Sequence, residues 1–72
     1  MRIEETLKKI GINVKSARLK MGLTQEELGE KCGLDSRHIG FIERGEINAT
    51  VKTLFKIAQG LGCSVSSLFR KV

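Results

Sequence analysis

The sequence contains no proline, no run of alternating polar and apolar residues and no low-complexity linker. Proline breaks helices, and strict alternation is the pattern that predicts a half-buried strand. The absence of both therefore favours a chain made of helices. At 72 residues it predicts a single domain with little surface burial to spare, so contact with a second subunit would add stability.

Cysteine and histidine are scarce. Cys32 and Cys63 lie far apart without the short spacing of a metal-binding pair, and there is one histidine in the chain. A zinc site needs more ligands than these, so two small apolar side chains in a reducing compartment are expected. The sequence also lacks a histidine–nucleophile pair and a phosphate-binding glycine loop. We therefore expect a protein that is not an enzyme and that takes no cofactor.

Long apolar segments are also missing. The N-terminal residues lack the apolar core of a signal peptide, and no stretch is long enough to span a membrane. These absences predict a cytoplasmic protein without a membrane partner.

The charge of +5 is distributed unevenly along the chain. Residues 1–20 carry a net +4, residues 51–72 carry another +4 without any acid, and residues 21–50 carry −3. Basic terminal segments of this kind are suited to binding a polyanion, although many basic proteins bind nothing charged.

Apolar spacing and end signals predict five helices. The first runs from Ile3 to Lys20, and Gly11 interrupts its apolar stripe, so its first residues form a separate turn or an extension. Thr24 and Glu27 match a capping box at the start of the second helix, which ends near Cys32.

The remaining helices have capping residues of their own. Asp35 precedes the third helix, Thr50 precedes the fourth, Val51 to Leu61, and Ser64 opens a short fifth. Two residues alone separate the second and third helices, which forces a sharp crossing. A mid-helix glycine costs about 1 kcal/mol, and close approach at this crossing is the reason that we assign to Gly29.

The third helix has an unusual outer face. At about 100° per residue, Ile39 and Ile42 face the core, while a glycine and a bare aromatic lie where charged residues would serve a soluble helix better. The residues predicted to point outward are Arg37, Gly40, Phe41 and Arg44.

These segments carry a family resemblance. Gln25, Gly29, Gly33, Ile39 and Ile42 have the spacing of a helix-turn-helix, and they occur together with "GLTQEEL", "IERG", "TLFKIAQGLG" and a final "LF". The sequence resembles the lambda-repressor-like (Cro/CI, or Xre) family of DNA-binding domains over about residues 10 to 70. Within that family it is most similar to the controller proteins of restriction–modification systems. The resemblance implies a compact all-α, five-helix domain over residues 1–72, with the helix-turn-helix at about 24–44.

The resemblance implies that the third helix enters the major groove. Arg37 would bind guanine O6 and N7, Ser36 a base edge or a phosphate, and Phe41 a thymine methyl, while Gly40 would allow close approach. Phe41 packing against Met21 or a partner is an equal alternative, and His38 is open between a structural role, a phosphate contact and a base contact. Backbone contacts are expected from Thr24, Gln25, Arg44, Asn48, Thr50 and Lys52.

Two further roles follow from the resemblance. Arg18 and Glu43 would form a structural salt bridge between the first helix and the end of the third. Residues 61–72 would build a two-fold dimer through Val65, Leu68 and Phe69, although Leu68 and Phe69 alternatively complete the monomer's own core, with Leu68 inward and Phe69 outward.

The sequence thus predicts a homodimeric transcriptional regulator on a pseudo-palindromic double-stranded DNA operator, with an RNA polymerase contact if it activates. The alternative is a helical protein-interaction module or an antitoxin of the same fold. A salt titration distinguishes the two functions, because the affinity of a protein for duplex DNA falls steeply as the salt concentration rises.

Overall fold

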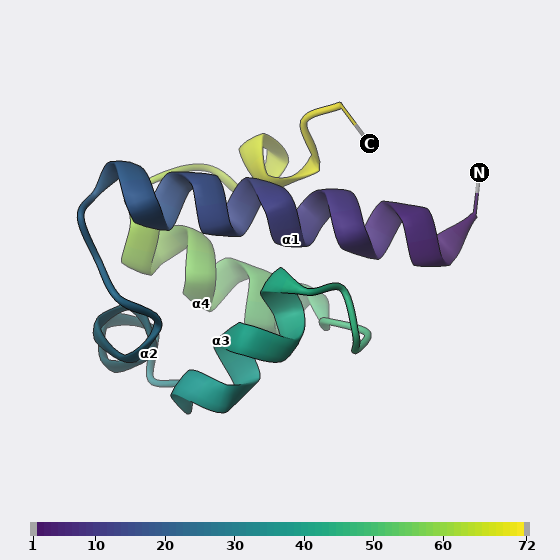
Figure 1. Cartoon of the computed structure of the whole chain (residues 1–72). Coiled ribbons are helices and arrows are strands. Elements are labelled where there is room, and N and C mark those ends of the chain that lie inside the picture. The colour runs from purple at the N-terminus through teal and green to yellow at the C-terminus, as the bar shows by residue number, and fades with distance from the viewer. Residues whose placement is uncertain (1, 72) are drawn as a thin grey trace.

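Over residues 2–71, which the computed structural model describes, the chain forms four α-helices and one 3-10 helix (Figure 1). In chain order they are α1 (Ile3–Lys20), α2 (Gln25–Cys32), α3 (Ser36–Glu43), α4 (Val51–Leu61) and η1 (Val65–Phe69). The described residues contain no strand, which confirms the all-α class. The predicted fifth helix is a single 3-10 segment. Met1 and Val72, the ends of the predicted domain, lie outside the described residues.

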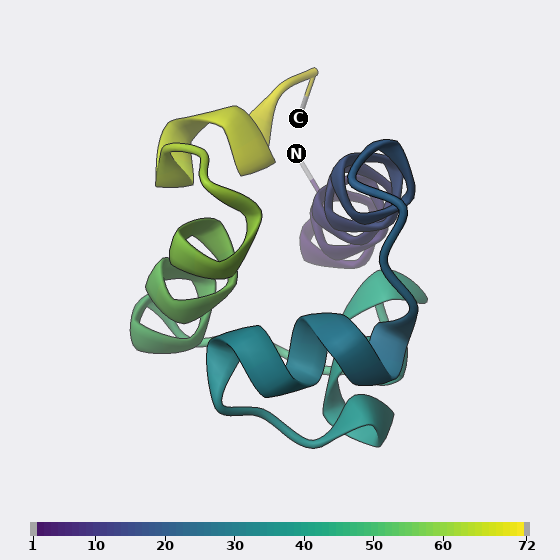
Figure 2. The same cartoon turned by 90° about the vertical axis from the view of Figure 1, so that its left-hand side faces the viewer.

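The core takes at least one large side chain from every element. Val14, Leu28, Ile39, Ile57 and Leu68 are the largest fully buried side chains, and each comes from a different helix. Figure 2 shows α1, α4 and η1 arranged around the middle of the molecule, with α2 and α3 crossing one end of it. The apolar face of each helix is therefore buried by the neighbouring helices, since none of them buries a face by itself.

The α1 helix is continuous, so the prediction of a break at Gly11 is wrong. Gly11 is buried, and a Cβ there would collide with the carbonyl oxygens of Ile42 and Glu43. This glycine lets α3 end directly against α1 without weakening the helix, because packing of the two elements offsets its poor helix propensity.

The turn between α2 and α3 depends on two glycines. Gly33 follows α2 in the left-handed conformation, with φ of 72°. A Cβ on Gly29 would lie 2.5 Å from the carbonyl oxygen of Leu34 in the turn. Close approach was the predicted reason for Gly29, and the structure confirms it.

Side-chain caps begin the other helices as predicted. Thr24 accepts a hydrogen bond from the backbone N–H of Glu27, and the Glu27 carboxylate accepts one from that of Thr24, which completes the capping box. The other three caps have a single bond each: the side chains of Asp35, Thr50 and Ser64 accept from the backbone N–H groups of Arg37, Thr53 and Ser67, at the starts of α3, α4 and η1. These caps satisfy donors that a helix start otherwise leaves free.

The C-terminal segment is fastened to α1 by Asn13. Its side-chain amide donates hydrogen bonds to the carbonyl oxygens of Leu68, at 2.9 Å, and Arg70, at 2.8 Å. Among the described residues, no helix has the length and apolar character needed to cross a bilayer.

Candidate nucleic-acid interface

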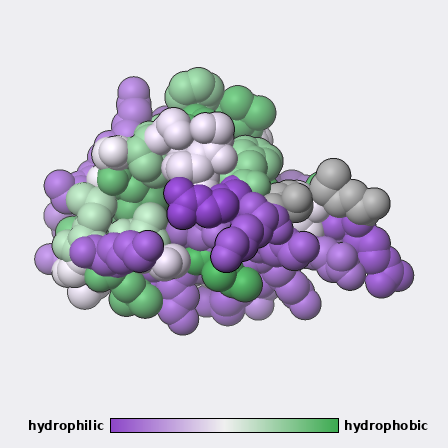
Figure 3. Space-filling model, turned by 90° about the horizontal axis from the view of Figure 1, so that it is seen from above, coloured by the Kyte–Doolittle hydropathy of each residue, from purple (hydrophilic) through white to green (hydrophobic). Residues whose placement is uncertain are grey.

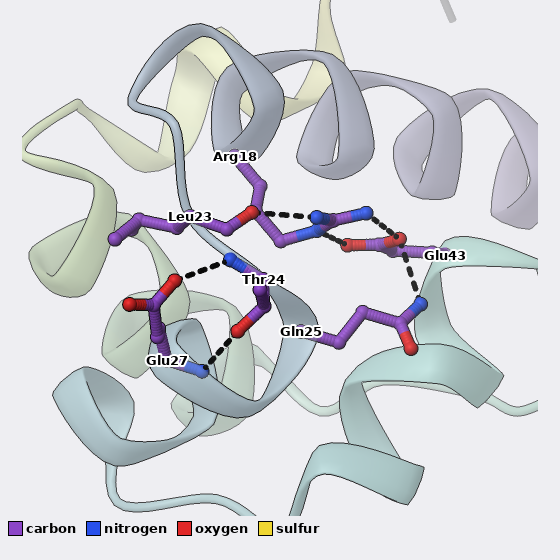
Figure 4. Close-up of polar contacts among 6 residues, drawn as sticks. All are labelled: Arg18, Leu23, Thr24, Gln25, Glu27 and Glu43. Carbon is purple, nitrogen blue, oxygen red and sulfur yellow. Dashed lines mark hydrogen bonds and ion pairs between the residues drawn. The ribbon is translucent and has the colours of Figure 1, made fainter.

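Arg18 and Glu43 form a buried ion pair between α1 and the end of α3 (Figure 4). Arg18 Nε donates to Glu43 Oε2 at 2.7 Å, Nη2 donates to Oε1 at 3.1 Å, and Nη1 donates to the Leu23 carbonyl at 2.7 Å. The hydrogen bond with Glu43 raises the pKa of the Arg18 guanidinium, although burial opposes it. The predicted salt bridge is confirmed. Its bidentate geometry fixes the relative orientation of the guanidinium and the carboxylate as well as the distance between them.

Gln25, the first residue of α2, joins this pair. Its Nε2 donates to Glu43 Oε1 at 3.1 Å, so one carboxylate contacts both α1 and α2 (Figure 4). An amide nitrogen carries two hydrogens, so one remains for another acceptor. The sequence predicted a phosphate contact for Gln25 and missed the bond to Glu43. That bond holds the start of α2 beside the end of α3.

The outer face of α3 presents Arg37 and Phe41 to solvent, as predicted. The Arg37 side chain is 85% exposed and lies 3.6 Å from the Asp35 carboxylate, and Phe41 is 41% exposed. Ile39 and Ile42 are inside the core. Ser36 and His38 are half-buried at the edges of this face.

Gly40 is an exception to the predicted exposure, because it is buried. The atoms over it belong to long side chains: a Cβ at this position would lie 3.1 Å from Arg44 Nη1 and 3.6 Å from Gln25 Oε1. Gly40 is therefore on the outer side of α3, as expected, but the side chains of Arg44 and Gln25 cover it.

Arg44 follows the last residue of α3, and its guanidinium bends back over the helix. Its Cζ lies 5.3 Å from the centroid of the Phe41 ring, within the range of a cation–π contact. Its Nε lies 3.1 Å from Glu46 Oε1.

Two shallow hollows lie on either side of Phe41. The smaller, of about 200 Å³, opens between α2 and α3. The larger, of about 420 Å³, extends to the loop after α3. The smaller is lined by Gln25, Ser36, Arg37, Gly40, Phe41 and Arg44, and the larger by Asp35, Arg37, His38, Phe41 and Ile47. The structure thus brings all five predicted base-recognition residues and Gln25 together on one surface.

This geometry agrees with the comparison with known proteins. The helix-turn-helix family model HTH_3 matches residues 14–68. The chain belongs to the helix-turn-helix family. It is 42% identical over 57 residues to an uncharacterized HTH-type transcriptional regulator of Sinorhizobium fredii, covering 79% of this chain and 74% of that one. It is also 42% identical over 59 residues to the control protein C.SmaI of Serratia marcescens, covering 82% and 70%.

Solved structures give the same result. The restriction–modification controller protein C.AhdI of Aeromonas hydrophila superposes with a TM-score of 0.86 at 35% identity, over 88% of this chain and 96% of that one. The controller protein C.Esp1396I superposes with a TM-score of 0.81 at 41% identity, over 89% and 83%. This helix-turn-helix protein is a DNA-binding transcriptional regulator.

The loop after α3 and the start of α4 hold the other predicted backbone contacts. Asn48, Thr50 and Lys52 are exposed, as is Thr24 at the start of α2. The Thr50 hydroxyl accepts from the Thr53 N–H at 3.1 Å and donates to the Thr53 hydroxyl at 3.0 Å, so its capping role is established. Contacts of these residues with DNA remain predictions.

The predicted dimer residues separate into two groups. Leu68 is 1% exposed and belongs to the monomer core, so it is not available to a second subunit, and that part of the prediction is wrong. The alternative considered for it, an inward Leu68 with an outward Phe69, is confirmed, since Phe69 is 42% exposed. Val65 is half-buried against the core.

Sequence reasoning missed two exposed apolar residues on α4. Val51 is 67% exposed and Phe55 is 55% exposed, one helical turn apart. Both lie off the buried stripe of α4, which is Leu54, Ile57, Ala58 and Leu61. That offset was the signal available in the sequence. Hydrophobic residues are also visible among hydrophilic ones on the side of the molecule that carries η1 (Figure 3).

Proposed function

We propose that this helix-turn-helix protein is a homodimeric regulator of the restriction–modification controller type, which binds a pseudo-palindromic operator in the cytoplasm. The observation that carries the proposal is the bonding of Glu43 to both Arg18 and Gln25. This carboxylate holds the start of α2 beside the outer face of α3. The start of α2, which would contact the DNA backbone, and α3, which would enter the major groove, are thereby held in one relative orientation. Insertion of α3 into the major groove requires such an orientation.

Base recognition is assigned to the exposed face of α3. Arg37 has an exposed guanidinium that fits the two acceptors of guanine, and Phe41 offers an apolar surface to a thymine methyl. Ser36, His38 and Gly40 complete this surface. Backbone contacts are assigned to Thr24, Gln25, Asn48, Thr50 and Lys52, whose N–H, hydroxyl and ammonium groups suit phosphate oxygens.

The dimer is assigned to a surface on α4 and η1 made by Val51, Phe55 and Phe69. Their exposure supports the assignment, because three large apolar side chains in water favour association with a second copy. A two-fold dimer would place the two α3 helices about 34 Å apart, matching half-sites one duplex turn apart. A contact with RNA polymerase is part of the proposal if the protein activates.

Selection from a randomised duplex pool tests the proposal. The full chain should enrich two inverted half-sites, and its affinity for the enriched duplex should fall steeply as salt rises. Arg37→Ala should relax the preference at one base pair per half-site, whereas Lys52→Ala should weaken all duplexes about equally and reduce the salt slope by about one. Enrichment of no motif would refute sequence-specific binding.

The exposed aromatic on α3 favours one second candidate, a protein-interaction module or antitoxin of the same fold. Phe41, at 41% exposed, would then contact a protein. This candidate predicts little duplex binding at physiological salt, so the same salt titration separates the two functions.

A further inference from the structure

The guanidinium of Arg44 folds back over the outer face of α3 and does not extend past the end of the helix. Arg44 follows the last turn of α3, and helical side chains lean toward the N-terminus of their helix. Its guanidinium accordingly lies over Phe41, and Nη1 lies 3.1 Å from the place where a Gly40 Cβ would be. The charged group therefore sits over the middle of the outer face of α3, among the residues that would meet base edges.

Two neighbours fix how the guanidinium is turned. The carboxylate of Glu46 lies 3.1 Å from Nε, and the Phe41 ring lies 5.3 Å from Cζ. With Nε paired, the terminal nitrogens Nη1 and Nη2 remain for two acceptors side by side, the arrangement of O6 and N7 on guanine. Both partners of the ion pair are about half exposed, so its contribution is orientation more than stability.

The glycine at position 40 makes room for this arrangement. A side chain there would begin 3.1 Å from Arg44 Nη1, in the hollow of about 200 Å³ that Gly40 helps to line. The amide of Gln25 is also close to this position, with Oε1 at 3.6 Å and Nε2 at 3.7 Å. A helix-weakening residue on this face is thus explained by the group that lies over it.

We propose that Arg44 is a base-recognition residue that binds a guanine in each half-site, with Glu46 and Phe41 as positioning residues for its guanidinium. The proposal rests on the function proposed above and changes the role that the family resemblance implies for Arg44, a phosphate contact. The two roles differ in their consequence, because a base contact carries sequence preference and a phosphate contact does not.

The test is selection from a randomised duplex pool with the full chain, run in parallel for the wild type, Arg44→Ala and Arg37→Ala. Arg44→Ala should lose a guanine preference of about tenfold to a hundredfold at one base pair per half-site, at a position different from the one lost in Arg37→Ala. Circular dichroism should show unchanged helicity, because Arg44 is exposed. A uniform loss of affinity with an unchanged motif would overturn the proposal.

Glu46→Ala supplies a second readout. It removes an acid close to DNA, so total affinity should rise, while the guanine preference at the Arg44 position should fall several-fold because Nε loses its partner. A rise in affinity with the preference intact would overturn the positioning role of Glu46. If the wild type enriches no motif, the proposed function fails. If the wild type enriches a motif that Arg44→Ala retains, only the assignment of Arg44 fails.

Discussion

The guanidinium of Arg18 and the carboxylate of Glu43 meet inside the protein through two hydrogen bonds, with 8% and 3% of their side chains exposed. A buried pair of this kind is costly to break from one side, because the remaining charge has no adequate partner. Arg18→Leu should therefore lower the free energy of unfolding by about 3–5 kcal/mol in urea denaturation followed by circular dichroism.

The matched double variant, Arg18→Leu with Glu43→Leu, should recover most of that loss, because no charge is left buried. Arg37→Ala, which removes the exposed pair with Asp35, should change stability little. A single-variant loss no larger than that of Arg37→Ala would show that the buried pair contributes as weakly as a surface one.

Two glycines in helices should respond to alanine in opposite ways. Gly11→Ala should destabilise the protein, because the new methyl meets the backbone carbonyls of Ile42 and Glu43, which cannot move without separating α1 from α3. Gly40→Ala should be neutral or stabilising by up to about 1 kcal/mol, because only flexible side chains must shift. Thermal denaturation compares the two, and equal effects would contradict the packing of α1 on α3.

The exposed apolar pair on α4 should control self-association. Phe55→Ser should weaken the dimer by about tenfold or more, as loss of an aromatic anchor does at protein interfaces. Its fold should survive because Phe55 is 55% exposed. Sedimentation velocity over a concentration series gives the measurement, and Ile12→Ser, which alters a residue on α1 that is 63% exposed, is the control. The dimer surface is misassigned if Ile12→Ser has the larger effect.

Asp35 should make stability depend on acidity. The backbone N–H of Arg37 donates to its carboxylate and lowers the pKa of Asp35 below its usual range. Because the folded-state pKa is lower than the unfolded one, the cap stabilises the protein above the ordinary aspartate pKa of about 3.9 and loses this effect as the pH falls through the folded-state pKa.

Asp35→Asn keeps a capping group that does not titrate. Chemical denaturation of both proteins from neutral to acidic pH should show a stability difference that changes in the acidic range and stays constant above it. A difference that is constant throughout would contradict a charged cap.

The features predicted most accurately from the sequence are those that depend on residues close together in the chain. The Thr24–Glu27 capping box involves four consecutive residues, and such local hydrogen bonds have sequence signatures. The family spacing placed α2, α3 and the Arg18–Glu43 pair. The helical periodicity placed most of the outward residues of α3.

Predictions failed for features that depend on contacts between residues far apart in the chain. The sequence predicts a break at Gly11 because the carbonyls that require a glycine there come from the end of α3, distant in the chain. Helical periodicity places Gly40 on the exposed face, and it does not show that the side chains of Arg44 and Gln25 cover it. The sequence left two positions open for Leu68, a dimer interface or the monomer core, because an apolar side chain suits either one. The structure places it in the core. The choice between acceptors for Gln25 likewise depended on where Glu43 lies.

Every element gives the core at least one large side chain, and η1 gives Leu68. The 3-10 helix is therefore part of the monomer's own core, whether or not the protein dimerises. Asn13 fastens the same turn from α1. Removing the residues after Gly62 would thus expose the core to solvent on the η1 side. It would also loosen α2 and α3 at the opposite end, in the monomer as much as in the dimer.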